Sequence, residues 1–118
     1  MENQSLLDFS ENISADVKAL FSLNPLKYSR KEIAHNLEIN AKNLSVPEQV
    51  HSAVVEFARF PGMYPAADGL VTQDPEIILT LKVADCVPVF LYDPSKNIIG
   101  LVHSGWRGTV ENIVLNAI

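Results

Sequence analysis

The chain has 118 residues, of which 47% are hydrophobic and 19% charged, and its formal net charge is −5. A chain of this length forms one domain at most, with enough apolar residues for a modest core. The negative charge and the lack of any basic run of five residues argue against nucleic acid or an anionic membrane as the main partner. No apolar stretch is long enough to span a membrane, and the N-terminus lacks the basic start of a secretory signal, so we expect a cytoplasmic protein.

The first third of the chain contains one ambiguous segment and one clear helix pattern. Residues 17–23 fit either a helical face or a strand, and we favour a strand. Ser29 and Glu32 form a capping box, and the apolar residues that follow recur at helical spacing. The pattern therefore predicts a helix over 29–44. His35 lies off the apolar stripe of this helix, so we expect its side chain to be solvated.

The middle of the chain places a histidine and an aspartate on neighbouring predicted segments. Residues 48–57 alternate as a strand, which puts His51 on one of its two faces. Turn signals predict a loop over 59–73. Within that loop, Asp68 could lead a short strand over 69–72 and bring a carboxylate near a site, or it could be an ordinary turn aspartate.

The last third of the chain predicts a β-hairpin. Its apolar runs predict three strands, at 76–84, 87–92 and 98–103. The turn at 93–97 would let the second and third of these strands pair. Cys86 stands at the start of one and His103 at the end of the other, so pairing would bring the two side chains close together. As the only cysteine, Cys86 cannot form a disulfide within the chain.

Residues 102–109 (VHSGWRGT) join the end of the last strand to a helix pattern over 109–118. Thr109 can cap that helix, whose free N–H groups form a natural anion site, and Arg107 could hold phosphate with two hydrogen bonds. The alternative is a tight strand-to-helix turn with Trp106 in the core. The helix pattern reaches the last residue without a capping signal, so we expect a larger protein to continue beyond it.

Cys86 and His103 support two chemistries. In one, the histidine takes the thiol proton and Cys86 becomes a nucleophile. In the other, both side chains bind a metal such as zinc or copper, and catalysis then needs a third protein ligand and an open position. His51 is the candidate third ligand, because it lies on a strand that is expected to be buried. The interpretation without any chemistry also stays open.

Four short motifs are more specific than spacing alone. They stand at 49–52 (QVHS), 67–72 (ADGLVT), 84–88 (ADCVP) and 103–109 (HSGWRGT). In this order they resemble the YfiH/YlmD family, whose names include laccase domain, polyphenol oxidase, purine nucleoside phosphorylase and peptidoglycan editing factor. The helix predicted over 29–44 is similar to the family's helix before its first histidine, whereas the N-terminal third matches poorly.

The resemblance implies a zinc ion held by His51, Cys86 and His103, with copper as the alternative metal. It implies an α+β fold of the CNF1/YfiH-like type, a mixed β-sheet with flanking helices. Residues 1–118 would then be the N-terminal portion of a single laccase domain whose C-terminal half is absent. It also implies a purine nucleoside phosphorylase that acts on adenosine, inosine and methylthioadenosine, with adenosine deaminase activity, so nucleoside and phosphate are the expected partners.

Within such a site we expect Cys86, His103, Arg107 and Asp85 to take part in catalysis. Arg107 and the helix start would seat phosphate, and Asp85 and Asp68 are candidates for a proton relay or for orienting a ligand histidine. The alternative functions are a Cys–His hydrolase of cell-wall precursor peptides and a copper polyphenol oxidase. A further alternative is an inactive half-domain that is stable only with a partner or as a homo-oligomer.

Overall fold

The structure is a computed structural model that describes residues 6–8, 10, 17–22, 30–36, 38–83, 87–105 and 113–118. The chain divides into two compact units, Met1–Ala41 and Lys42–Ile118, and each is treated by itself. Within the part of the chain that is described, no helix is long and apolar enough to cross a membrane.

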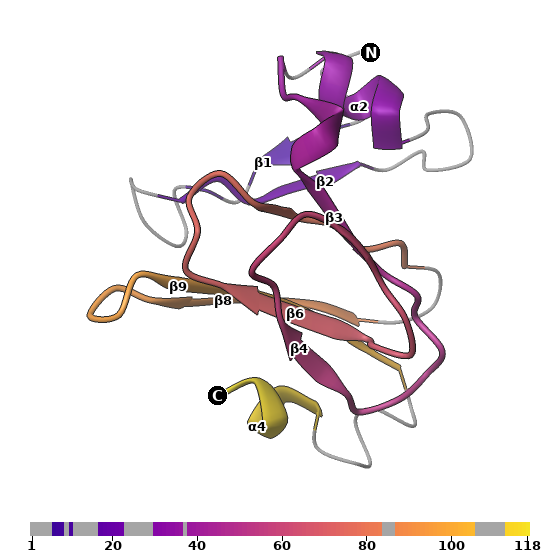
Figure 1. Cartoon of the computed structure of the whole chain (residues 1–118), viewed down its shortest axis with the longest axis vertical. Coiled ribbons are helices and arrows are strands. Elements are labelled where there is room, and N and C mark those ends of the chain that lie inside the picture. Colours follow the sequence, from indigo (N-terminus) through magenta and orange to yellow (C-terminus); the bar gives the residue numbers. More distant parts are fainter. Residues whose placement is uncertain are drawn as a thin grey trace. The chain divides into compact units, whose positions relative to one another are not determined.

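The first unit contains a small sheet and a short helix (Figure 1). Strand β1 (Leu6–Asp8) pairs antiparallel with β2 (Leu20–Ser22), which confirms part of the strand predicted at 17–23. Helix α2 (Arg30–Asn36) is shorter than the predicted helix over 29–44. The chain leaves the helix at Glu38, whose φ of 58° is left-handed and whose N–H donates to the His35 carbonyl (3.1 Å). His35 itself is exposed, as predicted.

A three-stranded parallel sheet opens the second unit. After the short 3-10 helix η2 (Ala41–Asn43), β3 (Leu44–Pro47) runs between β5 (Gly62–Tyr64) and β7 (Ile78–Leu79). The predicted helix was therefore wrong at Leu44, because pairing on both sides of β3 outweighs the local helix preference there. The strand predicted over 76–84 reduces to β7 in the described residues.

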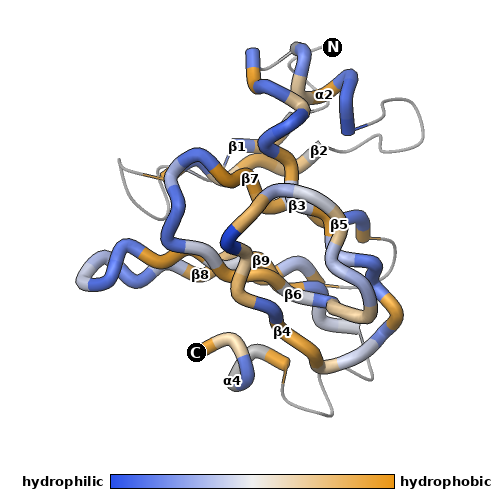
Figure 2. Tube along the Cα trace, in the orientation of Figure 1, coloured by the Kyte–Doolittle hydropathy of each residue, from blue (hydrophilic) through white to orange (hydrophobic). Residues whose placement is uncertain are grey.

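A four-stranded mixed sheet follows, in the order β4-β6-β9-β8. Its strands are β4 (Val55–Phe57), β6 (Gly69–Thr72), β8 (Val87–Asp93) and β9 (Ile98–Ser104). Strands β4 and β6 are parallel, and the other neighbours are antiparallel. The β8–β9 pair confirms the predicted hairpin, and Figure 2 shows hydrophilic residues at its turn. The strand at 69–72 is also confirmed as β6. With few helices beside mixed sheets, the α+β prediction is confirmed.

Helix α4 (Ile113–Ala117) packs against the four-stranded sheet, where it contacts β4, β6 and β9 (Figure 1). Ile113 is fully buried there together with Leu70 and Val102, and the Asn116 amide donates to the Ala53 carbonyl (2.8 Å). This helix lies within the predicted 109–118 segment, of which residues 109–112 fall outside the described part.

Two predictions for the middle of the chain were wrong. The predicted strand over 48–57 is a strand only at β4, and residues 48–54 form an irregular segment that includes His51. The predicted loop over 59–73 contains an unforeseen strand, β5, in addition to the short strand already considered at 69–72. Both errors have one cause, because the pairing partners of these residues lie far along the chain and are invisible to a local pattern.

Gly69 gives a test of this packing. A Cβ at Gly69 would lie 3.1 Å from Val102 Cγ2 and 3.2 Å from Val55 Cγ2. We expect Gly69→Val to lower the free energy of unfolding by about 1–3 kcal/mol, measured by urea unfolding, because the buried strands cannot move apart freely. Adding Val55→Ala to this variant should restore part of the loss. Unchanged stability in Gly69→Val would contradict the close approach of β4, β6 and β9.

Candidate functional site

Asp68 is placed by backbone pairing immediately before β6. Its N–H donates to the Val54 carbonyl (3.0 Å), and its carbonyl accepts from the His103 N–H (2.7 Å). These two bonds continue the pairing of β6 with both of its neighbours, β4 and β9, by one more residue. The residue is completely buried, with 0% of its surface exposed, so the direction of its carboxylate is fixed by the sheet.

The Asp68 carboxylate accepts five hydrogen bonds from two segments of the chain, the loop at residues 50–52 and the end of β9 at His103. Its Oδ1 accepts from the backbone N–H of Val50 (2.9 Å) and from both the N–H and the hydroxyl of Ser52 (2.9 Å each). Its Oδ2 accepts from the His51 N–H (3.1 Å) and from His103 Nδ1 (2.8 Å). A single carboxylate therefore shapes the loop that carries His51 and also holds the ring of His103.

The environment of Asp68 favours its ionised form. Burial by itself would raise the pKa of Asp68, but the hydrogen bonds from His103, Ser52 and Val50 outweigh burial and hold the pKa below its usual value. The carboxylate is therefore charged at neutral pH and can only accept hydrogen bonds.

His103 is oriented by this carboxylate. It is 4% exposed near the end of β9, and its Nδ1 must carry the proton because the facing Asp68 oxygen is an acceptor. With the proton on Nδ1, Nε2 is the ring nitrogen that is left to bind a ligand. This is the arrangement seen in carboxylate–histidine–metal triads, in which the carboxylate fixes the tautomer and raises the basicity of the ligand nitrogen.

His51 lies beside His103 but on a loop instead of a strand. The ring centroids are 5.5 Å apart and the ring planes are inclined by 61°. His51 is exposed, and both it (φ 63°) and Gln49 (φ 61°) have left-handed backbone conformations that non-glycine residues rarely adopt. The prediction that His51 lies on a buried strand was wrong, because three successive N–H groups, at residues 50–52, turn towards one carboxylate.

The other predicted site residues, Asp85, Cys86 and Arg107, lie outside the described residues, as does Trp106. The hairpin register is nevertheless defined up to the start of β8, where Val87 faces Ser104 and Pro88 faces His103. Among the described residues alone, no group of three His, Cys, Asp or Glu side chains is arranged to hold a metal ion. The two histidines and Asp68 are the part of the candidate site whose geometry is defined.

Sequence reasoning missed Ser52 and the role of the 49–52 loop. Asp68 was expected only as one of two candidates for orienting a histidine, and its bond to His103 fits that expectation. The signal that could have identified Ser52 is its place one residue after His51, where a short hydroxyl can share the carboxylate that binds the loop.

Comparison with known proteins gives a consistent family match. The family model described as "Multi-copper polyphenol oxidoreductase laccase" matches residues 22–118. A purine nucleoside phosphorylase of Deinococcus radiodurans is 38% identical over 89 residues, covering 75% of this chain and 35% of that protein. Another, of Borreliella burgdorferi, is 30% identical over 117 residues, covering 92% of this chain and 49% of that protein. The chain thus spans between a third and a half of these relatives.

Solved structures agree with the fold. The crystal structure of YlmD from Geobacillus stearothermophilus matches with a TM-score of 0.68 and 34% identity, covering 71% of this chain and 35% of that one. A Neisseria meningitidis protein matches 95% of this chain and 55% of its own, with a TM-score of 0.77. Its identity is 21%, so it supports the fold alone.

The hydrogen bonds of Asp68 predict a large effect of removing its charge. We expect Asp68→Asn to lower the free energy of unfolding at pH 7 by about 3–5 kcal/mol, because an amide cannot accept from all the buried donors and leaves the His103 pair broken. Urea unfolding measures the loss. Asp93→Asn is the matched control, since that carboxylate accepts from Ser95 and Lys96 in an exposed turn, and its loss should be clearly smaller.

The lowered pKa of Asp68 also fixes the sign of a pH dependence. Its stabilisation is fully present above the unfolded value of about 3.9 and is lost as the pH falls through the lower folded pKa. The difference in unfolding free energy between wild type and Asp68→Asn should therefore shrink as the pH is lowered below about 4. A difference that stays constant through that range would contradict the ionised state of Asp68.

Proposed function

This chain belongs to the family described as multi-copper polyphenol oxidoreductase laccase, and we propose that its site serves a zinc-dependent purine nucleoside phosphorylase. The observation that carries the proposal is the Asp68–His103 bond, with a second imidazole beside it. The relatives are named purine nucleoside phosphorylases, and these names suggest the substrate class. Because the chain spans only part of those relatives, the activity of the whole protein is part of the proposal.

The donor set fits zinc. Imidazole nitrogen and thiolate sulfur are common zinc ligands, and three protein ligands with one open position are typical of catalytic sites. His103 offers Nε2 with its tautomer fixed by Asp68, and His51 lies with its ring centroid 5.5 Å from that of His103. We assign the third ligand to Cys86, which precedes Val87 at the start of the strand paired with β9.

A zinc ion held by His51, Cys86 and His103 would act as a Lewis acid that activates water near neutral pH, which would suit the deamination of adenosine. The residues of the chain have separate tasks. Asp68 accepts a hydrogen bond from Nδ1 of His103, which fixes the ring orientation and leaves Nε2 as the nitrogen available to a metal ion. The backbone N–H groups of residues 50–52 donate to Asp68, so the backbone of His51 is held in place without a strand.

In phosphorolysis a phosphate oxygen bonds to C1′ of the ribose while the bond from C1′ to the purine nitrogen breaks. The purine leaves with the electron pair and takes up a proton, and ribose 1-phosphate remains. We propose adenosine, inosine and methylthioadenosine as substrates, with Arg107 and the helix start that follows it as the phosphate seat. Asp85 is the candidate for supplying or relaying the proton.

Copper polyphenol oxidation is the second candidate, because the family description names it. A multicopper cluster needs more ligands than one His–Cys–His set offers, so we rank this function second. Oxygen-dependent oxidation of a phenol by the copper-loaded protein, without phosphate-dependent release of purine base, would reverse this order.

The first test is the metal content of protein purified without chelator or metal-binding tag. We expect about one zinc per chain in the wild type and a loss of most of it in His51→Ala and in His103→Ala, because two ligands cannot hold the ion tightly. His35→Ala is the control, since that histidine is exposed on α2 and should leave the zinc content unchanged.

Activity is measured separately as release of adenine or hypoxanthine in the presence and absence of inorganic phosphate. Zinc in the wild type together with phosphate-dependent release supports the whole proposal. A metal-free wild type, or a His103→Ala variant that keeps its zinc, would overturn the ligand assignment.

A further inference from the structure

We propose that Gln49 is a positioning residue that ties the loop carrying His51 to the chain segment leading to Cys86. The inference rests on the zinc site proposed above, and it concerns a residue that binds neither metal nor substrate in that proposal. It follows from a pair of hydrogen bonds between residues 33 positions apart.

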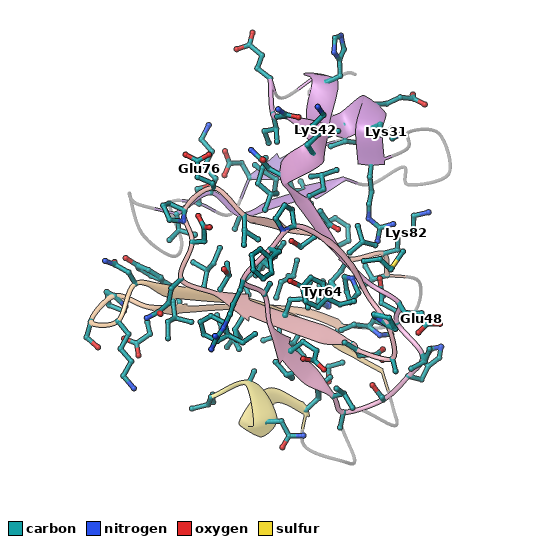
Figure 3. The ribbon with its side chains drawn as sticks, viewed as in Figure 1. Lys31, Lys42, Glu48, Tyr64, Glu76 and Lys82 are labelled. Carbon is teal, nitrogen blue, oxygen red and sulfur yellow. The ribbon has the colours of Figure 1, made fainter. Side chains whose placement is uncertain are left out.

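The side chain of Gln49 forms a reciprocal pair with the backbone of Lys82. Its Nε2 donates to the Lys82 carbonyl, and its Oε1 accepts from the Lys82 N–H (2.8 Å). A carboxamide has the donor and the acceptor of a peptide group, so this pair reproduces one rung of a β-ladder with a side chain in place of a strand. Figure 3 shows Lys82 and Glu48, the neighbour of Gln49, on the same side of this unit.

The hydrogen-bond pair between Gln49 and Lys82 lies just beyond the point where the backbone pairing between β3 and β7 ends. Strand β3 pairs with β7 up to Ser45 and Leu79, and the Ser45 carbonyl then accepts from Thr80 N (3.1 Å). Pro47 has no N–H to continue a ladder. At Gln49 the left-handed backbone (φ 61°) turns its N–H to the Ala67 carbonyl (2.9 Å), which leaves the side chain to bond with Lys82.

Gln49 thereby connects the segment that carries His51 with the segment that leads to Cys86, and both carry ligands of the proposed metal site. It stands two residues before His51, and its own N–H bonds to the residue before Asp68. Lys82 stands four residues before Cys86. Metal ligands must be placed within about 0.2 Å of their ideal distances, so a bond that fixes one ligand-bearing segment against another affects metal affinity without touching the ion.

The test is a titration with Co²⁺, which reports affinity and ligand type without any catalytic assay. We expect Gln49→Ala to weaken Co²⁺ binding by about 10–100-fold, the range found for residues that position metal ligands. The sulfur-to-cobalt absorption band should weaken more than the visible bands of the ion, because the segment leading to the thiolate is released. Gln49→Glu keeps the acceptor for Lys82 N–H but loses the donor, so it should not restore wild-type affinity.

The matched control is Gln73→Ala. The Gln73 amide also donates to a lysine carbonyl, that of Lys96 (3.1 Å), but it follows the end of β6 opposite to the end at which Asp68 and His103 lie. Its removal should leave both the affinity and the spectrum unchanged, which separates positioning from a general loss of stability. Urea unfolding of the metal-free variants checks folding, and Gln49→Glu carries the test if Gln49→Ala does not fold.

The outcomes are distinguishable. A wild type that binds no Co²⁺ fails the proposed zinc site itself. A wild type that binds Co²⁺ with a sulfur band, together with Gln49 variants of the same affinity and spectrum, overturns the role of Gln49 and leaves the zinc site standing. Equal losses in the Gln49 variants and in Gln73→Ala also overturn it, because the effect would then be one of stability.

Discussion

The buried carboxylate of Asp68 is the constraint on which the rest of the site depends. An unpaired charge at a position with no exposed surface would be strongly destabilising, and here five donors compensate it. The same bonds satisfy three successive N–H groups of an irregular loop, which would otherwise be without strand partners. The buried carboxylate and the loop at residues 50–52 therefore stabilise each other. We expect neither the burial of the charge nor the conformation of the loop to persist without the other.

Strand order explains why the carboxylate is found at this place. Strands β6 and β9 are antiparallel with Gly69 opposite Val102, so the residue before β6 meets His103 near the end of β9. Strand β4 is parallel to β6, so the loop before β4 lies at the same end of the strands as Asp68, the residue before β6. Gly69 permits the close approach of both neighbours, since a side chain there would press on Val55 and Val102. Packing at one glycine is thus linked to the position of two histidines.

The elements that could be predicted are those whose pairing partners are near in sequence. The β8–β9 hairpin has alternating apolar runs around one turn, and this local pattern was enough to place His103 at a strand end. The conformation of His51 could not be predicted in this way, because the carboxylate that bends its loop lies 17 residues further along. Strand β3 was hidden for the same reason: both of its partners come later in the chain, and its first residue, Leu44, continues an apparent helix pattern.

The pair of Asp68 and His103 is by itself compatible with two chemistries. In a Cys–His hydrolase, a carboxylate on Nδ1 would prepare Nε2 to take the proton of a thiol, and in a metal site it prepares the same nitrogen to bind the ion. The second imidazole favours the proposed metal site over the hydrolase. A thiol nucleophile needs only His103 as its base and has no need of a second histidine, whereas a metal ion needs a further ligand, such as His51, whose ring centroid lies 5.5 Å from that of His103.

The left-handed backbone of His51 is a second argument for the metal site. Strain at a non-glycine residue persists where the surroundings enforce it, and here they enforce the position of an exposed imidazole beside a buried one.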